Sequence, residues 1–216
     1  GVIAAVLATL VTLPIWRLGG HYVSMATLAL GYIVLSVIRG WDALTKGAYG
    51  LSGIPAPEIL GLRLLVAEDH YQLDLVVLAI TLFVVFRIRS SHLGNVLAAV
   101  GSDEIASRSL GLRTRGYKAL AYALAAFFAG MAGALLAHQY NYLDPTVFTV
   151  QMSVLVLTIV VLGGINSPFG AVLGSLALVG LPEALRLAPD VRILLYGIVV
   201  IAIIRFLPQG LWTRRA

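Results

Sequence analysis

The sequence predicts an all-α protein, a polytopic bundle of transmembrane helices. Of its 216 residues, 60% are hydrophobic and only 12% are charged, whereas soluble domains carry about 25% charged residues. The mean hydropathy is +0.96. The apolar runs approach ~20 residues, enough to cross a bilayer, and they lack the alternation of a barrel strand. The chain has no cysteine, which excludes disulfides and thiolate metal sites.

The chain begins at Gly1 inside an apolar run, so we expect a fragment of a longer protein whose first span, residues 2–13, is clipped. We predict one transmembrane domain over residues 1–216, with about five complete spans besides the clipped one. The next two spans are expected at residues 22–38 and 73–88.

A long loop, residues 39–72, joins these two spans. Gly47, Gly50 and Gly53 permit tight turns in it, and Pro55 stiffens its exit. Residues 58–67 are expected to form a short interfacial helix. A loop of this length is often functional rather than a mere connector.

Small residues repeat every four positions along the span predicted at residues 117–138. Gly130 and Gly133 belong to two adjacent rows of alanine and glycine, which form a face suited to close helix packing.

The segment that follows, residues 139–149, contains no Lys or Arg and is expected to face away from the cytoplasm. A span predicted at residues 146–162 carries Gln151 and Thr158. These side chains, with Asn166 beyond the span, either line a translocation path or are polar groups satisfied between packed helices.

Glycine and proline interrupt the chain between residues 163 and 174, where the structural glycines are Gly163, Gly164, Gly170 and Gly174. The interruption is either a tight cytoplasmic turn or a break at membrane depth, which is tolerated only against protein or a water-filled cavity. The span after it is expected to end near residue 185, and a last span covers residues 193–207.

The longest polar run, residues 87–118, carries more positive charge than any other loop and contains a predicted cytoplasmic loop at residues 89–116. Ser102 is predicted as the N-cap of a helix of about two turns, with Asp103 and Glu104 in its first turn. Gly111 is predicted to end this helix in the left-handed conformation.

A helix of this length is unstable alone in water, so it needs a surface to pack on. Ile105, Ser109 and Leu110 lie at helical spacing and form a narrow contact face. We therefore interpret the helix as a docking element for a cytoplasmic partner.

The charge pattern also predicts orientation. The segment at residues 87–118 and the C-terminus, with Arg214 and Arg215, are the most basic stretches, and both are expected in the cytoplasm. The net charge of +5 is explained by this rule and does not suggest nucleic acid. No metalloprotease, nucleophile-elbow or phosphate-loop motif is present, so any ATP must be bound by another chain.

Seven sequence pieces, in order, resemble the LivM-type branched-chain amino acid ABC-transporter permeases. They are RLGGHYVSMATLALGYIV (17–34), GLSGIP (50–55), DEIASRSLGL (103–112), YKALAYALAAFFAGMAGALLAH (117–138), DPTVFT (144–149), VLGGINSPFGAVLG (161–174) and FLPQGL (206–211). The resemblance covers nearly all of the chain.

The resemblance implies the membrane subunit of an importer in a bacterial or archaeal inner membrane, paired with a LivH-type permease. Two ATPase subunits would bind ATP and Mg²⁺, a substrate-binding protein would deliver the substrate, and this chain would hold no cofactor and catalyse no reaction. The family's coupling helix falls on DEIASRSLGL, which assigns ATPase coupling to Asp103, Glu104, Ile105, Ser109 and Gly111.

Some features depart from the family pattern. Asn95, Ala98 and Gly101 are uncharged where members often carry basic residues, and Gly101 and Ser102 interrupt a helix that is commonly continuous. Alternative functions are a permease for urea, short amides or another small solute, an ATP-independent carrier or channel, and a membrane-embedded enzyme. Few ionisable residues lie within the spans, which counts against a proton- or sodium-coupled carrier.

Overall fold

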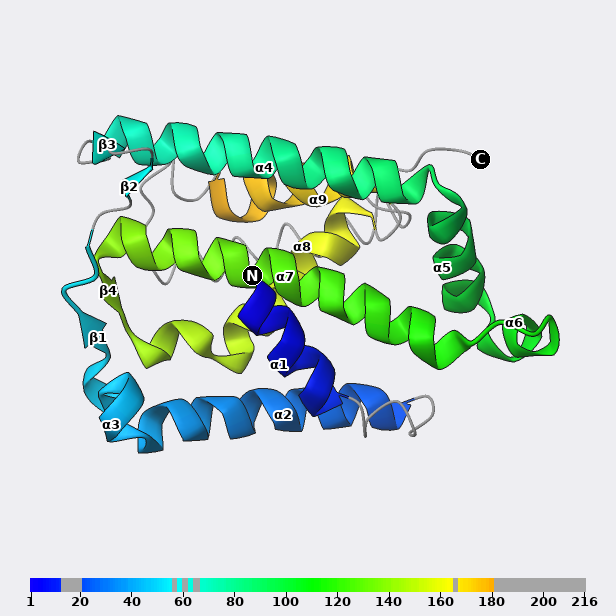
Figure 1. Ribbon diagram of the computed structural model, residues 1–216, viewed down its shortest axis with the longest axis horizontal. Coiled ribbons are helices and arrows are strands. Elements are labelled where there is room, and N and C mark those ends of the chain that lie inside the picture. Colours follow the sequence, from blue (N-terminus) through cyan, green and yellow to red (C-terminus); the bar gives the residue numbers. More distant parts are fainter. Residues whose placement is uncertain (13–20, 56–57, 60–61, 64–66, 165–166, 181–216) are drawn as a thin grey trace. The chain divides into compact units, whose positions relative to one another are not determined.

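The computed structural model describes residues 1–12, 21–55, 58–59, 62–63, 67–164 and 167–180. Most of these residues are helical, which confirms the predicted all-α class (Figure 1). The chain divides into two compact units, Gly1–Thr149 and Val150–Ala216, and each is described by itself.

The first unit contains seven α-helices within the described residues. They are α1 (Val2–Thr12), α2 (His21–Gly40), α3 (Asp42–Thr45), α4 (Ala67–Arg89), α5 (His92–Ser102), α6 (Glu104–Ser109) and α7 (Thr114–Tyr140). The helices α4 and α7 run side by side, with α5 and α6 at one end (Figure 1).

Two helices in the described part of the chain are long and apolar enough to cross a membrane, one at His70–Arg89 within α4 and the other α7 itself. A bent pair in the second unit makes a third span if it is counted as one. The helix α1 and the Met25–Gly40 part of α2 are apolar but shorter. The span predicted at residues 193–207 and the end of the one before it lie outside the described residues.

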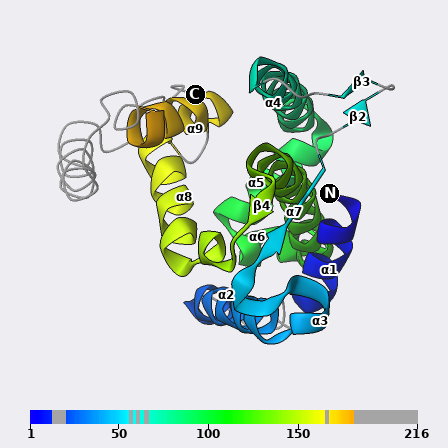
Figure 2. The ribbon, with the colours of Figure 1, turned by 90° about the vertical axis from the view of Figure 1, so that its left-hand side faces the viewer.

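The helix α1 packs against α7, and the two lie together in both ribbon views (Figures 1 and 2). Gly130 permits this approach, because a Cβ atom there would lie 2.5 Å from the Cβ of Ala4. Gly133, from the adjacent small-residue row, has no described atom within 4 Å of its Cβ position. The close helix contact therefore forms at Gly130.

The segment between α2 and α4 pairs with the segment that follows α7. The strand β1 (Leu51–Ser52) pairs antiparallel with β4 (Tyr142–Leu143), with Leu51 opposite Leu143. Short 3₁₀ helices flank these strands, η2 (Gly47–Tyr49) before β1 and η3 (Pro145–Phe148) after β4. Asp144 caps η3 by accepting the backbone N–H of Thr146 at 2.8 Å.

The prediction of a short helix at residues 58–67 is wrong. The strands β2 (Glu58–Ile59) and β3 (Leu62–Arg63) form a small antiparallel hairpin instead. A helix of about three turns gains too little stability without a packing surface, and antiparallel pairing of two short strands satisfies backbone groups locally.

The second unit begins with α8 (Val150–Gly163), a break, and α9 (Pro168–Ser175), which continues as a π-helical turn, η4 (Leu176–Gly180). The span therefore begins at Val150 rather than at residue 146, because Pro145–Phe148 forms η3 and Thr149 is extended. Across the break the helix direction changes by 120°.

Glycines allow α8 and α9 to pack closely. A Cβ atom on Gly163 would lie 2.0 Å from the carbonyl oxygen of Gly170, and one on Gly174 would lie 2.5 Å from that of Ile159. Gly164 has a φ of +110° at the bend, and Ser167 caps α9 by accepting the N–H of Gly170 at 3.1 Å. These glycines permit backbone contact between the two helices.

Candidate functional site

The candidate site lies at the end of the α4–α7 pair that carries α5 and α6. The helix α5 begins at an N-cap, Ser91, whose hydroxyl accepts the N–H of Gly94 at 3.4 Å. Val96 and Val100 are its buried apolar residues, and α5 contacts both α4 and α7. The helix α5 is therefore the base that holds α6 beside the start of α7.

The N-cap of α6 is Asp103, not Ser102. The Asp103 carboxylate accepts the backbone N–H groups of Ile105 at 2.9 Å and Ala106 at 3.0 Å. Ser102 is the last residue of α5, and its hydroxyl donates to the carbonyl of Ala98 at 2.9 Å. The prediction was wrong by one residue because α5 continues through Gly101 and Ser102, which moves the break to the extended Asp103.

Gly111 ends α6 as the sequence predicts. Its φ is +81°, the N–H of Gly111 donates to the carbonyl of Arg108 at 2.9 Å, and the N–H of Leu112 donates to that of Ser107 at 3.2 Å. These two bonds form a Schellman motif, in which a left-handed residue satisfies the last carbonyls of a helix. The motif turns the chain directly into α7.

Glu104 joins α6 to the first turns of α7. Its carboxylate pairs with the Lys118 ammonium and with Arg108 at 2.6 Å, and it accepts the hydroxyl of Thr114 at 3.3 Å. Arg108 also donates to the Thr114 hydroxyl at 3.0 Å. The hydrogen bond from Lys118 holds the pKa of the Glu104 carboxyl below its ordinary value, helped by Arg108 and opposed by desolvation. We call these four side chains the Glu104 cluster.

The opposite face of α6 is apolar and exposed. Ile105 and Leu110 are 79% and 80% exposed, and Ser109 is also exposed. Ser107 and Thr114 are buried, at 3% and 2% exposure, on the side where α6 meets α7. The helix thus rests on α7 through polar groups and leaves its apolar side chains without cover in the described part of the chain.

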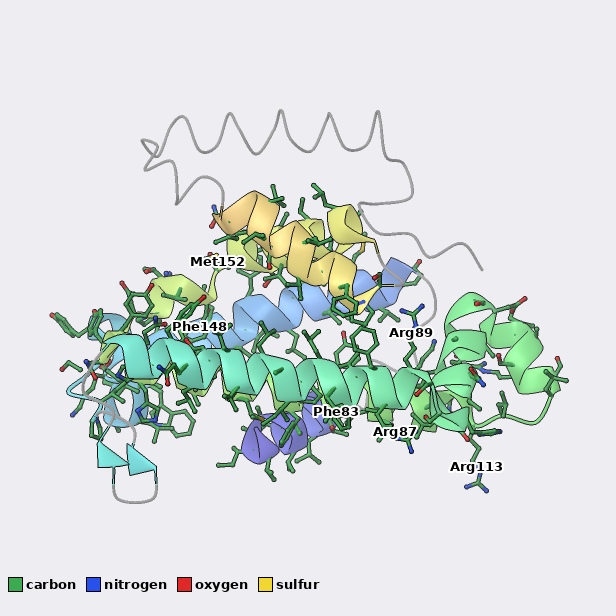
Figure 3. All side chains as sticks on the ribbon, turned by 90° about the horizontal axis from the view of Figure 1, so that it is seen from above. Phe83, Arg87, Arg89, Arg113, Phe148 and Met152 are labelled. Carbon is green, nitrogen blue, oxygen red and sulfur yellow. The ribbon has the colours of Figure 1, made fainter. Side chains whose placement is uncertain are left out.

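A hollow of about 350 Å³ lies between the α6–α7 turn and the start of α7. Its lining residues are Gly111, Leu112, Arg113, Gly116, Tyr117 and Leu120. Arg87 and Arg89 of α4 and Arg113 gather at the same end of the α4–α7 pair (Figure 3). This end therefore combines a helix with exposed apolar side chains, a hollow and positive charge, which is suited to receiving a protein surface.

The structure does not bring the predicted path residues together. Gln151 is exposed on α8, and the Thr158 hydroxyl donates to the carbonyl of Val154 at 2.8 Å, one turn earlier on the same helix. Asn166 lies outside the described residues. Their role in translocation stays a prediction.

Sequence reasoning missed Thr114 and Lys118 as partners of Glu104. The spacing of Glu104 and Arg108, four residues apart, is a readable helix signal. Lys118 lies 14 residues from Glu104 and reaches it only because the Gly111 turn reverses the chain. A sequence pattern contains no signal for such a contact.

The apolar helices α4 and α7, each long enough to cross a membrane, indicate a membrane protein, and comparison with known families identifies its class. Residues 1–204 match the family described as the branched-chain amino acid transport system permease component. The chain belongs to this family, which confirms the predicted resemblance and the class of transport subunit rather than enzyme.

Its relatives include the high-affinity branched-chain amino acid transport system permease proteins. The LivM proteins of Escherichia coli K12 and Salmonella typhimurium are 33% and 32% identical over 98% of this chain. The LivH protein of E. coli K12 is 33% identical over 65% of the chain and 44% of its own length. The chain spans 55% of the LivM length. No solved structure gives a significant match.

Proposed function

We propose that this chain is a membrane subunit of an ATP-driven importer of branched-chain, hydrophobic amino acids. In this proposal it forms part of the translocation path with a LivH-type permease and couples to two cytoplasmic ATPase subunits through α6. The observation that carries the coupling role is the capped α6 helix, which exposes Ile105 and Leu110 at 79% and 80%.

Physical reasoning supports α6 as the ATPase contact. Exposed apolar side chains on a short, capped helix are stable when a partner buries them. The Glu104 cluster fixes α6 to the start of α7, which is long enough to cross the membrane. Movement of the docked partner is therefore transmitted to a membrane span.

The proposal includes an orientation in a bacterial or archaeal inner membrane. The positive-inside rule supports a cytoplasmic α5–α6 end, which carries Arg87, Arg89, Arg113, Arg115 and Lys118. It supports the same side for the C-terminus, which carries Arg214 and Arg215. The segment after α7 carries Asp144 and no Lys or Arg before Thr149, so it faces the outside.

The other components follow from this role. The ATPase subunits hold ATP and Mg²⁺, so this chain needs no cofactor of its own. An extracytoplasmic binding protein delivers the substrate, and Gln151, Thr158 and Asn166 remain proposed positions on the path.

The test is uptake of labelled leucine into proteoliposomes that contain the full-length protein, its permease partner, the ATPase subunits and the binding protein. Uptake is measured with and without ATP, and with unlabelled valine, urea or ribose as competitors. We expect ATP-dependent uptake that valine alone blocks. Blocking by urea or ribose would change the substrate, and ATP-independent uptake beside an active ATPase would support a carrier instead.

A matched pair of variants tests the docking role of α6. Ile105→Asp places a charge on the proposed contact face, whereas Glu68→Gln changes a residue of α4, far from α6 in the chain. We expect the first variant to lose ATPase subunits from the purified complex and the second to retain them. Full retention by Ile105→Asp would contradict the docking role.

A further inference from the structure

A second hollow lies between α4 and α7, about 330 Å³ in volume, within the range of about 300–1,000 Å³ of small-molecule pockets. We call it the α4–α7 groove. Its lining residues are Asp74, Val77, Leu78, Thr81, Phe128, Ala132, Leu135, Leu136 and Gln139.

The polar groups of the groove are unevenly distributed. Asp74 is near the beginning of α4 and Gln139 near the end of α7, so both lie at the end opposite to α5 and α6. Farther along the two helices the lining is apolar apart from Thr81, and it includes the aromatic ring of Phe128. The hydroxyl of Thr81 donates to the carbonyl of Val77 at 2.8 Å and is thus used within α4.

Asp74 is half-buried, and its carboxylate has no hydrogen-bond or ion-pair partner within the residues that the structure describes. A carboxylate beside an apolar groove in a membrane helix is costly unless it serves a ligand or a partner. It is an acceptor for a cationic donor, and the Gln139 amide at the same end offers donors to a carboxylate.

We propose that the α4–α7 groove is a binding site for a free zwitterionic amino acid with an apolar side chain. Asp74 receives the α-ammonium group, Gln139 donates to the α-carboxylate, and the aliphatic lining holds the side chain. The inference rests on the proposed import function and adds a site at which this chain recognises the substrate. Charge complementarity and the division into a polar and an apolar end favour this occupant over a lipid tail alone.

By the proposed orientation, the Asp74–Gln139 end opens to the outside, because the opposite end carries the basic residues. The groove is therefore placed to receive substrate before the path opens inward. The groove belongs to the first unit, whereas Gln151 and Thr158 belong to the second.

The test uses photo-leucine, a leucine analogue with a diazirine in its side chain, on the complete complex in nanodiscs, both without nucleotide and with a non-hydrolysable ATP analogue. Irradiation followed by peptide mapping should place label on the groove residues of α4 and α7 in either state. Excess leucine should remove the label, and 4-methylpentanoate, which lacks the ammonium group, should not.

Two matched sets of variants sharpen the test. Asp74→Asn should reduce the competed label about tenfold, the effect of losing a charged hydrogen bond, while Asp74→Glu retains it. Val77→Trp fills the groove and should abolish the label. Val76→Trp is the control, since the Val76 side chain is 54% exposed and is not part of the groove lining.

The outcomes separate the two proposals. Failure of the import function appears as absent leucine uptake when the same purified wild-type complex is reconstituted into proteoliposomes. Normal uptake with no label in the groove, label that excess leucine does not remove, or equal labelling of Val77→Trp and Val76→Trp overturns the groove assignment. A lipid retained in the groove of the purified complex and undisturbed by leucine overturns it in favour of a lipid site.

Discussion

The two ends of the α4–α7 pair are held together in different ways. At the α6 end, Glu104 bonds to side chains 4, 10 and 14 residues away. At the opposite end, the Tyr142 hydroxyl donates to the carbonyl of Tyr49 at 2.9 Å across 93 residues. His138 Nδ1 donates to the carbonyl of Pro55 at 2.8 Å across 83 residues, beside the β1–β4 pairing.

The α6 end is therefore held by contacts between neighbouring segments of the chain, whereas the opposite end is held by contacts between segments far apart in the sequence. The α6 end depends on caps and ion pairs between consecutive elements, so it can shift relative to its surroundings without disrupting distant segments. The opposite end joins the α2–α4 connection to the end of α7 through main-chain hydrogen bonds, and opening it releases a large loop. In the proposed mechanism, the α6 end moves with the docked ATPase subunit, and the opposite end keeps its structure.

The largest effect on uptake is expected from Gly111→Val. A β-branched residue in the left-handed conformation costs about 1–2 kcal/mol or more, so the α6 stop is lost and uptake should fall about tenfold. Membrane insertion should be normal. Gly101→Val is the control, because Gly101 is helical and its Cβ position has open space. Unchanged ATP-driven uptake by Gly111→Val would count against the docking role of α6.

Gly50→Ala should destabilise the opposite end. Gly50 has a φ of +70°, and a Cβ atom there would lie 2.4 Å from the carbonyl oxygen of Leu143. The matched control is Gly53→Ala, whose φ of +76° gives similar strain but whose Cβ meets nothing within 4 Å. We expect about 1–3 kcal/mol more loss for Gly50→Ala, from overpacking. Equal thermal unfolding temperatures for the two variants would disprove the close approach of β1 and β4.

Asp103→Ala should weaken the start of α6 by about 1 kcal/mol, the usual cost of losing an N-cap. Ser102→Ala should have little effect, since Ser102 donates within α5 instead of capping α6. Hydrogen exchange at the amides of Ile105 and Ala106 measures the difference. Faster exchange in the Ser102 variant than in the Asp103 variant would restore Ser102 as the cap.

The Glu104–Lys118 pair should contribute to coupling as a unit. Glu104→Gln and Lys118→Met should each reduce ATP-driven uptake about two- to fivefold, and the double variant no further than either, because both remove one partly exposed pair. Glu104→Gln combined with Arg115→Met is the control. Its effects should multiply, since Arg115 is exposed and forms no bond with Glu104 in the described structure. If the effects of Glu104→Gln and Lys118→Met also multiply in their double variant, the ion pair does not contribute to coupling.

The smallest effect is a pH dependence of the α6 end. The folded pKa of Glu104 is lowered from 4.5. Its stabilisation is therefore present in full above this ordinary value and is lost as the pH falls through the lowered pKa. The thermal unfolding temperature of wild type minus that of Glu104→Gln should shrink on acidification below pH 4.5. A difference that grows on acidification would contradict the predicted sign.

The sequence alone determined the class of the fold, the membrane spans α4 and α7, and the left-handed stop at Gly111. These depend on hydrophobic run length and on local backbone chemistry, which a linear pattern records. The sequence-based prediction placed the N-cap of α6 one residue too early. It also assigned a helix to residues 58–67, where the local preferences for helix and strand are nearly equal.

Only the tertiary structure decided which residues meet across a turn or between helices. It brought Lys118 to Glu104, joined Gly50 to Leu143, and placed Asp74 and Gln139 on one groove. Each of these contacts depends on the direction of the chain after a turn or on the packing of two helices. Because residue order records neither quantity, the contacts had to be read from the folded chain.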